Sequence, residues 1–412
     1  MFKIEQEKDR KIEKIVLGNG VTLLFDYNSV FKSAACNLML QGGIVDEPQE
    51  KIGLTHFLEH LLFKSNKLYG TKQIAGIIDK LGGDVNAFTE PEALYVHGVV
   101  PAKGLEELIQ LTANLVLGAE FKEDNIRLER EVIRQEILAA EDDPEQVLMN
   151  CFYKHFYKGV AYANPILGSQ ETINSFTSTD FYQRLNILLT GKRMIWAFAG
   201  NVDIDKYAKQ IETLCSAVLP GEEVSYPGSK MYGGEYKAEG DFEQSYFVLG
   251  QPWVSASDPD YLTGNIFSVC FGESVSSRLF QNIREKLGLV YDIESTVESY
   301  HNSSAFLVLS TAEKKNIGMV IDKVLNEFKN LAEAKFSSEE LQYAKDLISS
   351  QIVMSDDLLE NRLWRLVDSE RIHKRYVSAG EVLDKVRCVS LGDLEAFVGK
   401  WVRGANRLLV RL

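Results

Sequence analysis

The sequence has few cysteines, and their arrangement excludes two kinds of cross-linked fold. Its 412 residues include 5 cysteines, which are scattered along the chain without CxxC spacing. A disulfide framework needs paired cysteines, and a zinc–thiolate cluster needs closely spaced ones. We therefore expect buried free thiols in a chain that is long enough for two or three domains.

Long apolar runs and an excess of positive charge are also missing. No run approaches the roughly 18 residues that span a bilayer, and the first residues, MFKIEQEKDRKIEK, are charged where a signal peptide is apolar. The chain has 45 Lys and Arg against 59 Asp and Glu, a formal net charge of −14 that repels nucleic-acid phosphates. We predict a cytoplasmic protein that neither inserts into a membrane nor binds nucleic acid.

A stretch rich in proline and glycine, residues 219–236, interrupts the periodic patterns near the middle of the chain. It predicts a linker between an N-terminal domain, 1–218, and a C-terminal domain, 237–412. The two parts share sequence, because AEFKEDNIRLEREVIRQEI (119–137) aligns without a gap with AKFSSEELQYAKDLISSQI (334–352). Two copies with a period near two hundred residues indicate a duplicated domain, not a solenoid.

Both halves alternate strand-like and helix-like patterns in the same order. In the first half, KIVLGNGVTLLFDY predicts a hairpin that turns at residues 18–20, and SAACNLML predicts a strand. Helical patterns cover GLTHFLEHLLF, TKQIAGIIDKL and much of 103–157, while DVNAFT and ALYVHGVV predict strands. The expected class is α+β: two homologous domains, each a mainly antiparallel sheet with helices packed on one face.

The pentad HFLEH at 56–60 is the most informative motif. Residues four apart share a face of a helix, so His56 and His60 can direct their imidazoles at one metal ion, with Glu59 beside them. By chance this pattern is expected in roughly one in a hundred chains of such composition. A surface helix with two solvated histidines is the alternative.

A third protein ligand is needed to complete a catalytic zinc site, with the fourth position left to water. The helical segment LEREVIRQEI offers Glu129 and Glu136, which lie two turns apart on one face. In the second copy the aligned residues are Ala344 and Gln351, and that half has no HxxEH. Only the first copy therefore carries the full acidic and imidazole set, although Glu136 as a plain solvated charge remains an alternative.

Together these motifs resemble the pitrilysin and insulinase family of zinc metallopeptidases, which carry an inverted HxxEH motif. The resemblance covers nearly the whole chain, including LGGDVNAFT, EREVIRQEI and SSRLFQNIREKLGLVYDI. The two-domain layout is most similar to the branch that contains the mitochondrial processing peptidase β-subunit and its bacterial relatives. The resemblance implies one Zn²⁺ per chain, held by His56, His60 and Glu136, with Glu59 as the general base and Glu129 as a supporting acid.

The resemblance also implies contacts with a peptide substrate. Asn86, Ala87, Phe88 and Thr89 match the family's strand whose edge pairs with the substrate backbone. Arg284 and Tyr291 match a pair that reaches the zinc site and stabilises the oxyanion of the tetrahedral intermediate. One departure is that Gln146 and Asn150 stand where the mitochondrial enzyme has acidic residues for a presequence arginine.

The expected function is zinc-dependent endoproteolysis of short or unfolded peptides within a dimeric chamber. The expected assembly is a homodimer, with a heterodimer containing a zinc-free homologue as the alternative. A catalytically idle structural or assembly subunit, or a peptide-binding partner without turnover, is the competing function. An intact HFLEH motif together with Glu136 favours the enzyme.

Overall fold

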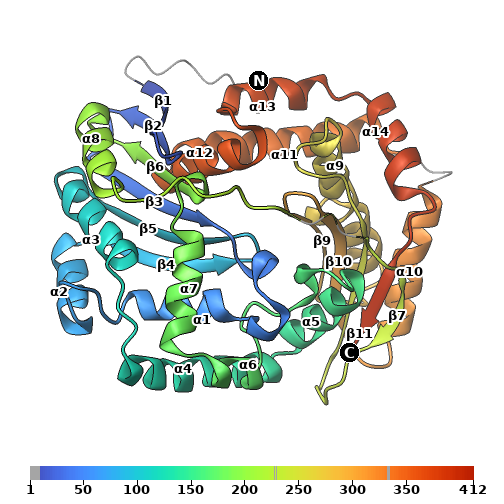
Figure 1. Cartoon of the computed structure of the whole chain (residues 1–412). Coiled ribbons are helices and arrows are strands. Elements are labelled where there is room, and N and C mark those ends of the chain that lie inside the picture. Colours follow the sequence, from blue (N-terminus) through green and yellow to red (C-terminus); the bar gives the residue numbers. More distant parts are fainter. Residues whose placement is uncertain (1–9, 227, 229, 332–334) are drawn as a thin grey trace.

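The computed structural model describes residues 10–226, 228, 230–331 and 335–412, which form two β-sheets with helices around them (Figure 1). Predictions that involve residues 1–9, Pro227, Ser229 or Ala334 lie outside the described residues. Among the described residues, no helix combines the length and the apolar character needed to cross a membrane. The five cysteines are free; Cys36, Cys215 and Cys270 are buried as expected, Cys151 is half-buried, and Cys388 is exposed, contrary to expectation.

The first sheet has the strand order β1-β2-β6-β3-β5-β4. Its strands are β1 (Arg10–Val16), β2 (Thr22–Asn28), β3 (Ser33–Gln41), β4 (Asp84–Glu90), β5 (Ala93–Pro101) and β6 (Met194–Gly200). All neighbours pair antiparallel except β2 and β6, which are parallel. The predicted β1–β2 hairpin is present, and Gly20 in its turn has φ +93°, a value that suits glycine.

The second sheet repeats this arrangement in the order β7-β11-β8-β10-β9. Its strands are β7 (Gly234–Lys237), β8 (Ser245–Pro252), β9 (Asp292–Ser299), β10 (Ser304–Ala312) and β11 (Leu408–Arg411). The parallel pair β7–β11 corresponds to β2–β6, and the remaining neighbours are antiparallel in both sheets. The predicted α+β class, with two homologous and mainly antiparallel sheets, is confirmed.

Helices follow the strands in both halves. Those of the first half are α1 (Leu54–Leu62), α2 (Thr71–Leu81), α3 (Leu105–Leu117), α4 (Glu123–Asp142), α5 (Pro144–Phe156), α6 (Gln170–Ser175), α7 (Ser178–Leu188) and α8 (Ile204–Leu214). Those of the second half are α9 (Tyr261–Ser268), α10 (Ile317–Asn330), α11 (Ser338–Asp356), α12 (Leu359–His373), α13 (Ala379–Cys388) and α14 (Leu391–Phe397). In the described part of the chain, three π-helical segments accompany them: Val269–Glu273, Phe280–Glu285 and Val398–Val402.

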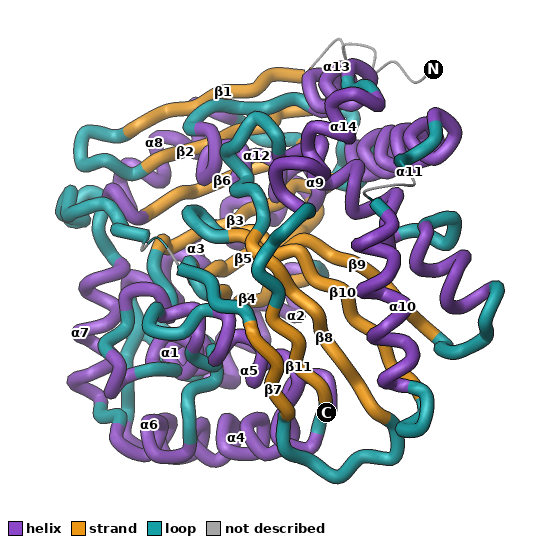
Figure 2. Tube along the Cα trace, turned by 90° about the vertical axis from the view of Figure 1, so that its right-hand side faces the viewer, coloured by secondary structure: helices purple, strands orange, loops and turns teal. Residues whose placement is uncertain are grey.

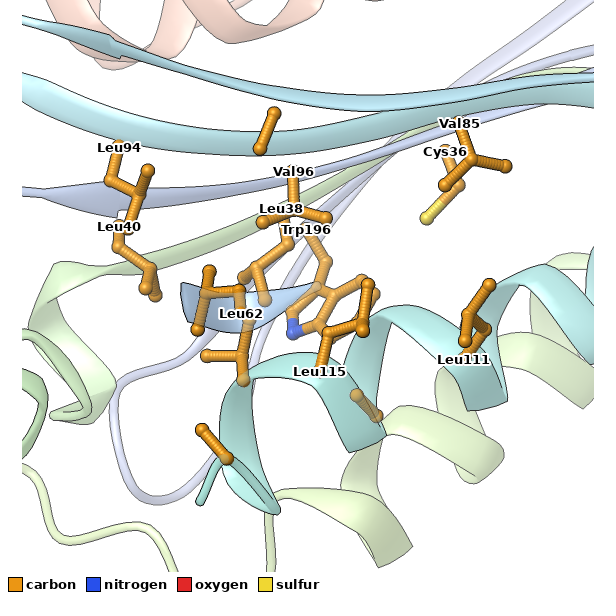
Figure 3. Packing of buried hydrophobic residues seen from close by; sticks show 14 of the residues in the cluster. Cys36, Leu38, Leu40, Leu62, Val85, Leu94, Val96, Leu111, Leu115 and Trp196 are labelled. Atoms are coloured by element: carbon orange, nitrogen blue, oxygen red, sulfur yellow. The ribbon is translucent and has the colours of Figure 1, made fainter. Parts of the chain in front are cut away.

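The larger apolar core lies between the first sheet and its own helices. Side chains alternate between the two faces of a strand, so Leu38 and Leu40 of β3 point to the same side. Figure 3 shows them packed with Trp196 of β6, Leu62 of α1 and Leu115 of α3. This core fixes α1, the helix that carries the HFLEH pentad, against the sheet.

The opposite face of each sheet is covered by a helix from the other half of the chain. On the first sheet, α12 packs on β2, β3 and β6, where Leu363 and Val367 contact a cluster that includes Met39 and Ala197. On the second sheet, α5 packs on β8 and β11, with Phe152 and Val410 in one cluster (Figures 1 and 2). Helix α5 of the first half thus covers the second sheet, and helix α12 of the second half covers the first sheet. The sequence patterns did not indicate this packing.

The predicted linker is shorter than expected at its C-terminal end. Residues 234–236 belong to β7, which pairs in parallel with β11, Gly234 opposite Leu408. The side chains of this four-residue strand are exposed on both faces, so it has no alternating pattern that would distinguish it from a linker.

Candidate metal centre

The pentad lies on α1, as predicted. Leu54, Leu58 and Leu61 on this helix are buried in the core of the first half. His56 and His60 therefore share the opposite, partly exposed side, and their ring centroids are 4.8 Å apart. The apolar residues thus set the rotation of the helix that brings the two imidazoles together.

The start of α1 is held by groups that the sequence analysis missed. The buried Glu47 carboxylate accepts hydrogen bonds from the backbone N–H of Gly53 (2.8 Å) and of Thr55 (2.6 Å), and so satisfies donors at the helix N-terminus. Gly53 has φ +95°, and a Cβ there would lie 2.8 Å from the Cα of Gly168. No residue with a side chain fits at this position without a shift of the backbone.

Arg184 of α7 connects this cap to the rest of the first half. It is buried, and its Nε donates to Thr55 Oγ1 (2.8 Å) while Nη2 donates to Asp46 Oδ1 (2.7 Å). Because the Thr55 hydroxyl in turn donates to Glu47, the end of α1 belongs to a buried network of charged groups. Sequence patterns gave no signal for this network, since its members are far apart along the chain.

Helix α4 brings the third candidate ligand to the two histidines. Glu136 Oε2 lies 3.8 Å from His56 Nε2 and 3.5 Å from His60 Nε2. One ligand atom from each of the three residues lies within 4.8 Å of the others. The aligned positions on α11, Ala344 and Gln351, offer no such set, which agrees with the difference seen between the two copies.

These three residues fit a zinc ion. Two atoms bound to one tetrahedral zinc at about 2.0–2.1 Å lie roughly 3.3–3.4 Å apart, close to the 3.5 and 3.8 Å between the imidazole nitrogens and the carboxylate. Burial, together with the nearby His60, lowers the pKa of His56 to about 3. The His56 imidazole is therefore neutral near pH 7, the form that binds a metal ion.

Glu129 contacts His60 from the side away from Glu136. Its Oε2 lies 3.3 Å from His60 Nδ1, and Lys64 Nζ lies 2.8 Å from its Oε1. Burial opposes the charge on Glu129, but the bonds from His60 and Lys64 keep its pKa below the usual value. An ionised Glu129 accepts the Nδ1–H of His60 and leaves the Nε2 lone pair directed at the ligand position. The sequence patterns did not predict the ion pair between Lys64 and Glu129.

Glu59 lies beside the two histidines and is held by the neighbouring strand. Thr89 Oγ1 of β4 donates a 2.6 Å hydrogen bond to Glu59 Oε2. Burial raises the pKa of Glu59, although the Thr89 bond and the proximity of His60 act in the other direction. A carboxylate whose pKa is raised is a stronger base, which suits it to accept a proton.

The predicted substrate strand, Asn86 to Thr89, forms most of β4. This strand is last in the sheet order and pairs only with β5 among the described strands, so its other edge is open to an added strand. Ala87 points into the core, whereas Asn86 is exposed and Phe88 is half-buried on the other face. The arrangement is compatible with the predicted pairing, which stays a prediction.

Arg284 and Tyr291 lie in the second half, on either side of the turn that precedes β9. The Arg284 guanidinium lies 5.7 Å from the centroid of the Tyr291 ring, and Tyr291 is 86% exposed. Within the described part of the chain, no hydrogen bond or ion pair joins either residue to the three candidate ligands. The structure brings the pair together but does not bring it to the candidate centre.

Comparison with known proteins places the chain in a family. Residues 23–170 match the family described as "Insulinase (Peptidase family M16)", and residues 175–348 match "Peptidase M16 inactive domain". A protein of Rickettsia bellii named "Uncharacterized zinc protease" is 30% identical over 95% of this chain and 93% of its own length. A Bacillus subtilis protein named "Uncharacterized zinc protease YmxG" is 24% identical over 92% of this chain and 93% of its own length.

Solved structures share the same fold. A protease from Helicobacter pylori superimposes with a TM-score of 0.90 at 18% identity, covering 98% of this chain and 99% of the other. A peptidase M16 inactive domain from Pseudomonas fluorescens gives a TM-score of 0.91 at 14% identity, with 97% of both chains covered. With the family matches, the full-length relatives and the His–His–Glu cluster taken together, the chain belongs to the pitrilysin and insulinase family, peptidase family M16.

Proposed function

We propose that this protein is a zinc-dependent endopeptidase that hydrolyses short or unfolded peptides. The observation that supports this most is the convergence of His56, His60 and Glu136 on one point, with the Glu59 carboxylate beside them. All three would bind the ion, one per chain, since the second copy of the fold carries no equivalent set among its described residues.

We assign the steps of peptide hydrolysis to the zinc ion and to side chains around it. A bound zinc ion supplies Lewis acidity, which makes water a better nucleophile and polarises the scissile carbonyl. Glu59 accepts the proton of the attacking water and returns it to the nitrogen of the leaving amine. Thr89 holds Glu59 in place, Glu129 orients His60, and the open edge of β4 pairs with the substrate backbone.

We expect Glu129→Gln to weaken zinc binding by about 10–100-fold, the usual cost of losing a partner that orients a ligand. The substitution removes the charge that faces His60 Nδ1 and that also pairs with Lys64. Zinc affinity is measured by competition with a chromophoric chelator. Glu131→Gln is the matched control, because Glu131 lies on the same helix and, among the described residues, its ion pair is with Arg134. Equal affinities in the two variants would contradict this role for Glu129.

We further propose that the active form is a dimer whose zinc sites are completed in trans. Arg284 and Tyr291 lie in the half without ligands, and Tyr291 is almost fully exposed to solvent. In a two-fold homodimer, the second half of one chain can face the first half of the other. Arg284 and Tyr291 would then stabilise the developing oxyanion in the partner's site.

Subunit mixing tests this sharing. A Glu59→Gln chain and an Arg284→Ala/Tyr291→Ala chain should each be nearly inactive, and their mixture should regain activity because each mixed dimer has one intact site. Native mass spectrometry measures how far the subunits have exchanged. Complete exchange with no return of activity would mean that the pair acts within its own chain or not at all.

The proposed activity itself is tested with an unstructured peptide mixture, with and without a chelator, and with fragments identified by mass spectrometry. An endopeptidase yields internal cleavages that stop with the chelator and resume when zinc is restored. Glu59→Gln provides the background. A zinc-loaded wild-type chain that cleaves nothing, in its native assembly, would instead indicate the idle subunit or the binding partner.

A further inference from the structure

A cavity of about 560 Å³ lies between the two halves of the chain, next to β4. Its walls come from the end of β4, the start of β5, the end of β9 and helix α12. None of these wall residues belongs to the candidate metal centre. The cavity lies across β4 from that centre, because Phe88 in its wall and the next residue, Thr89, which holds Glu59, point to opposite faces of the strand.

One side of the cavity is aromatic. Phe88 stacks on Tyr95 with ring centroids 4.7 Å apart, and Trp364 of α12 lies 5.5 Å from both rings. The faces of such rings carry partial negative charge and attract cations, tryptophan most strongly. They also provide an apolar surface for the methylene stem of a long basic side chain.

The other sides carry more negative than positive charge. Four carboxylates line the cavity, and Arg371 is the one basic side chain among its lining residues. Arg371 pairs with Glu92 at 3.0 Å, and Glu92 also accepts hydrogen bonds from Tyr162 Oη and the backbone N–H of His301. This leaves Glu90, Glu298 and Asp368. Asp368 also pairs with Arg371, at 3.5 Å, and the Arg371 charge acts on Glu90 as well.

Glu298 has an unused acceptor. Its Oε1 accepts a 2.6 Å hydrogen bond from Tyr153, but its Oε2 is buried and has no partner among the described residues. Among the described residues, Glu90 accepts a long hydrogen bond, 3.4 Å, from Tyr95. Burial raises the pKa of both carboxyls. An added cation would favour their ionised forms and satisfy the free oxygen.

The position on β4 indicates which molecule would bring that cation. Phe88 and Glu90 are two residues apart, so they face the same side of this edge strand, towards α12. A peptide paired to β4 would place every second side chain on that side. We infer that the cavity is a subsite for a lysine or arginine side chain of the peptide substrate. This inference rests on the proposed peptidase function. It places the site that binds a basic side chain of the substrate in this cavity and not at Gln146 and Asn150.

Binding without turnover tests this subsite. The zinc-loaded Glu59→Gln chain is titrated with N-acetylated decapeptides of alanine, serine and glycine, each carrying one lysine or, at the same position, norleucine. Fluorescence anisotropy of a C-terminal label reports the affinity. We expect lysine to bind about tenfold more tightly than norleucine at positions of one parity. Adding Glu298→Gln, which preserves the bond from Tyr153, should reduce this advantage to about threefold or less.

Two further variants test whether the lysine advantage comes from the carboxylates of the cavity. Glu294→Gln, on the same strand but outside the cavity, should leave the lysine advantage unchanged, and Glu90→Gln serves as a second test if the Glu298 variant fails to fold. The subsite is wrong if lysine and norleucine bind equally at every position. It is also wrong if the same peptides without the acetyl group gain affinity through their free N-terminal ammonium while lysine gives no gain. A lysine advantage in the Glu59→Gln chain, together with a zinc-loaded wild-type chain that hydrolyses none of these peptides, would overturn the proposed activity while leaving the subsite in place.

Discussion

Replacing Glu59 with glutamine should lower kcat by about 10²–10⁴-fold while the chain still binds zinc, because the substitution removes a proton acceptor and no ligand. Glutamine has nearly the same shape and can still accept the hydrogen bond from Thr89. The α1 helix and both imidazoles should therefore stay in place. The rate is measured with a quenched peptide, and bound zinc by elemental analysis of the same sample.

A control substitution at a surface carboxylate shows whether the loss of activity is specific to Glu59. Glu131→Gln should leave both the rate and the zinc content unchanged, since Glu131 is exposed and its ion pair is with Arg134, away from the candidate ligands. If Glu59→Gln lost zinc along with activity, Glu59 would be acting as a ligand. If it kept full activity, another group would be the general base.

Glu136→Gln, unlike Glu59→Gln, should lose the metal: we expect it to weaken zinc binding by more than about 100-fold. Losing a partner of a ligand already costs about 10–100-fold, and Glu136 is proposed as a ligand itself, with its Oε2 facing both histidines. An amide oxygen carries no net charge to replace the carboxylate. Activity should fall in parallel at limiting zinc, and equilibrium competition with a chelator measures the affinity.

A partial recovery of activity at high zinc concentration would agree with this role, because Glu59 and the histidines remain. Unchanged zinc affinity in Glu136→Gln would contradict it. Equal zinc loss in the Glu59 and Glu136 variants would also contradict it, since only Glu136 is proposed to bind the metal.

The sequence was sufficient for those features that depend on local spacing. His56, Glu59 and His60 lie within two turns of one helix, so their shared position follows from the helical repeat alone. Glu129 and Glu136 are likewise two turns apart on α4. The alternating patterns of β3 and β5 predicted the first sheet, and the repeat predicted the second.

Features that depend on contacts between distant parts of the chain could not be predicted from local spacing in the sequence. Glu47 caps α1, Lys64 pairs with Glu129, and Thr89 holds Glu59, but each of these polar side chains has an ordinary sequence context. Their roles follow from where the tertiary fold places their partners. The same holds for the cavity beside Phe88, whose walls come from both halves.

The exchange of α5 and α12 shows a further limit of pattern analysis. Each helix has an apolar face, but the pattern does not say which sheet covers it. Their clusters join the two halves, because Phe152 of α5 packs with Val410 of the second sheet and Leu363 of α12 with Met39 of the first. Neither half buries both faces of its sheet by itself, so we expect the two to unfold together.

We propose that one zinc ion, held by His56, His60 and Glu136, makes this chain a peptidase. Zinc is titrated into the metal-free protein while cleavage of a quenched peptide mixture is followed. We expect the rate to rise linearly and to reach a plateau at about one equivalent per chain, in line with a single three-ligand site. Saturation of the site with zinc and no cleavage at any ratio, or a plateau near two equivalents, would rule out this role for the zinc site.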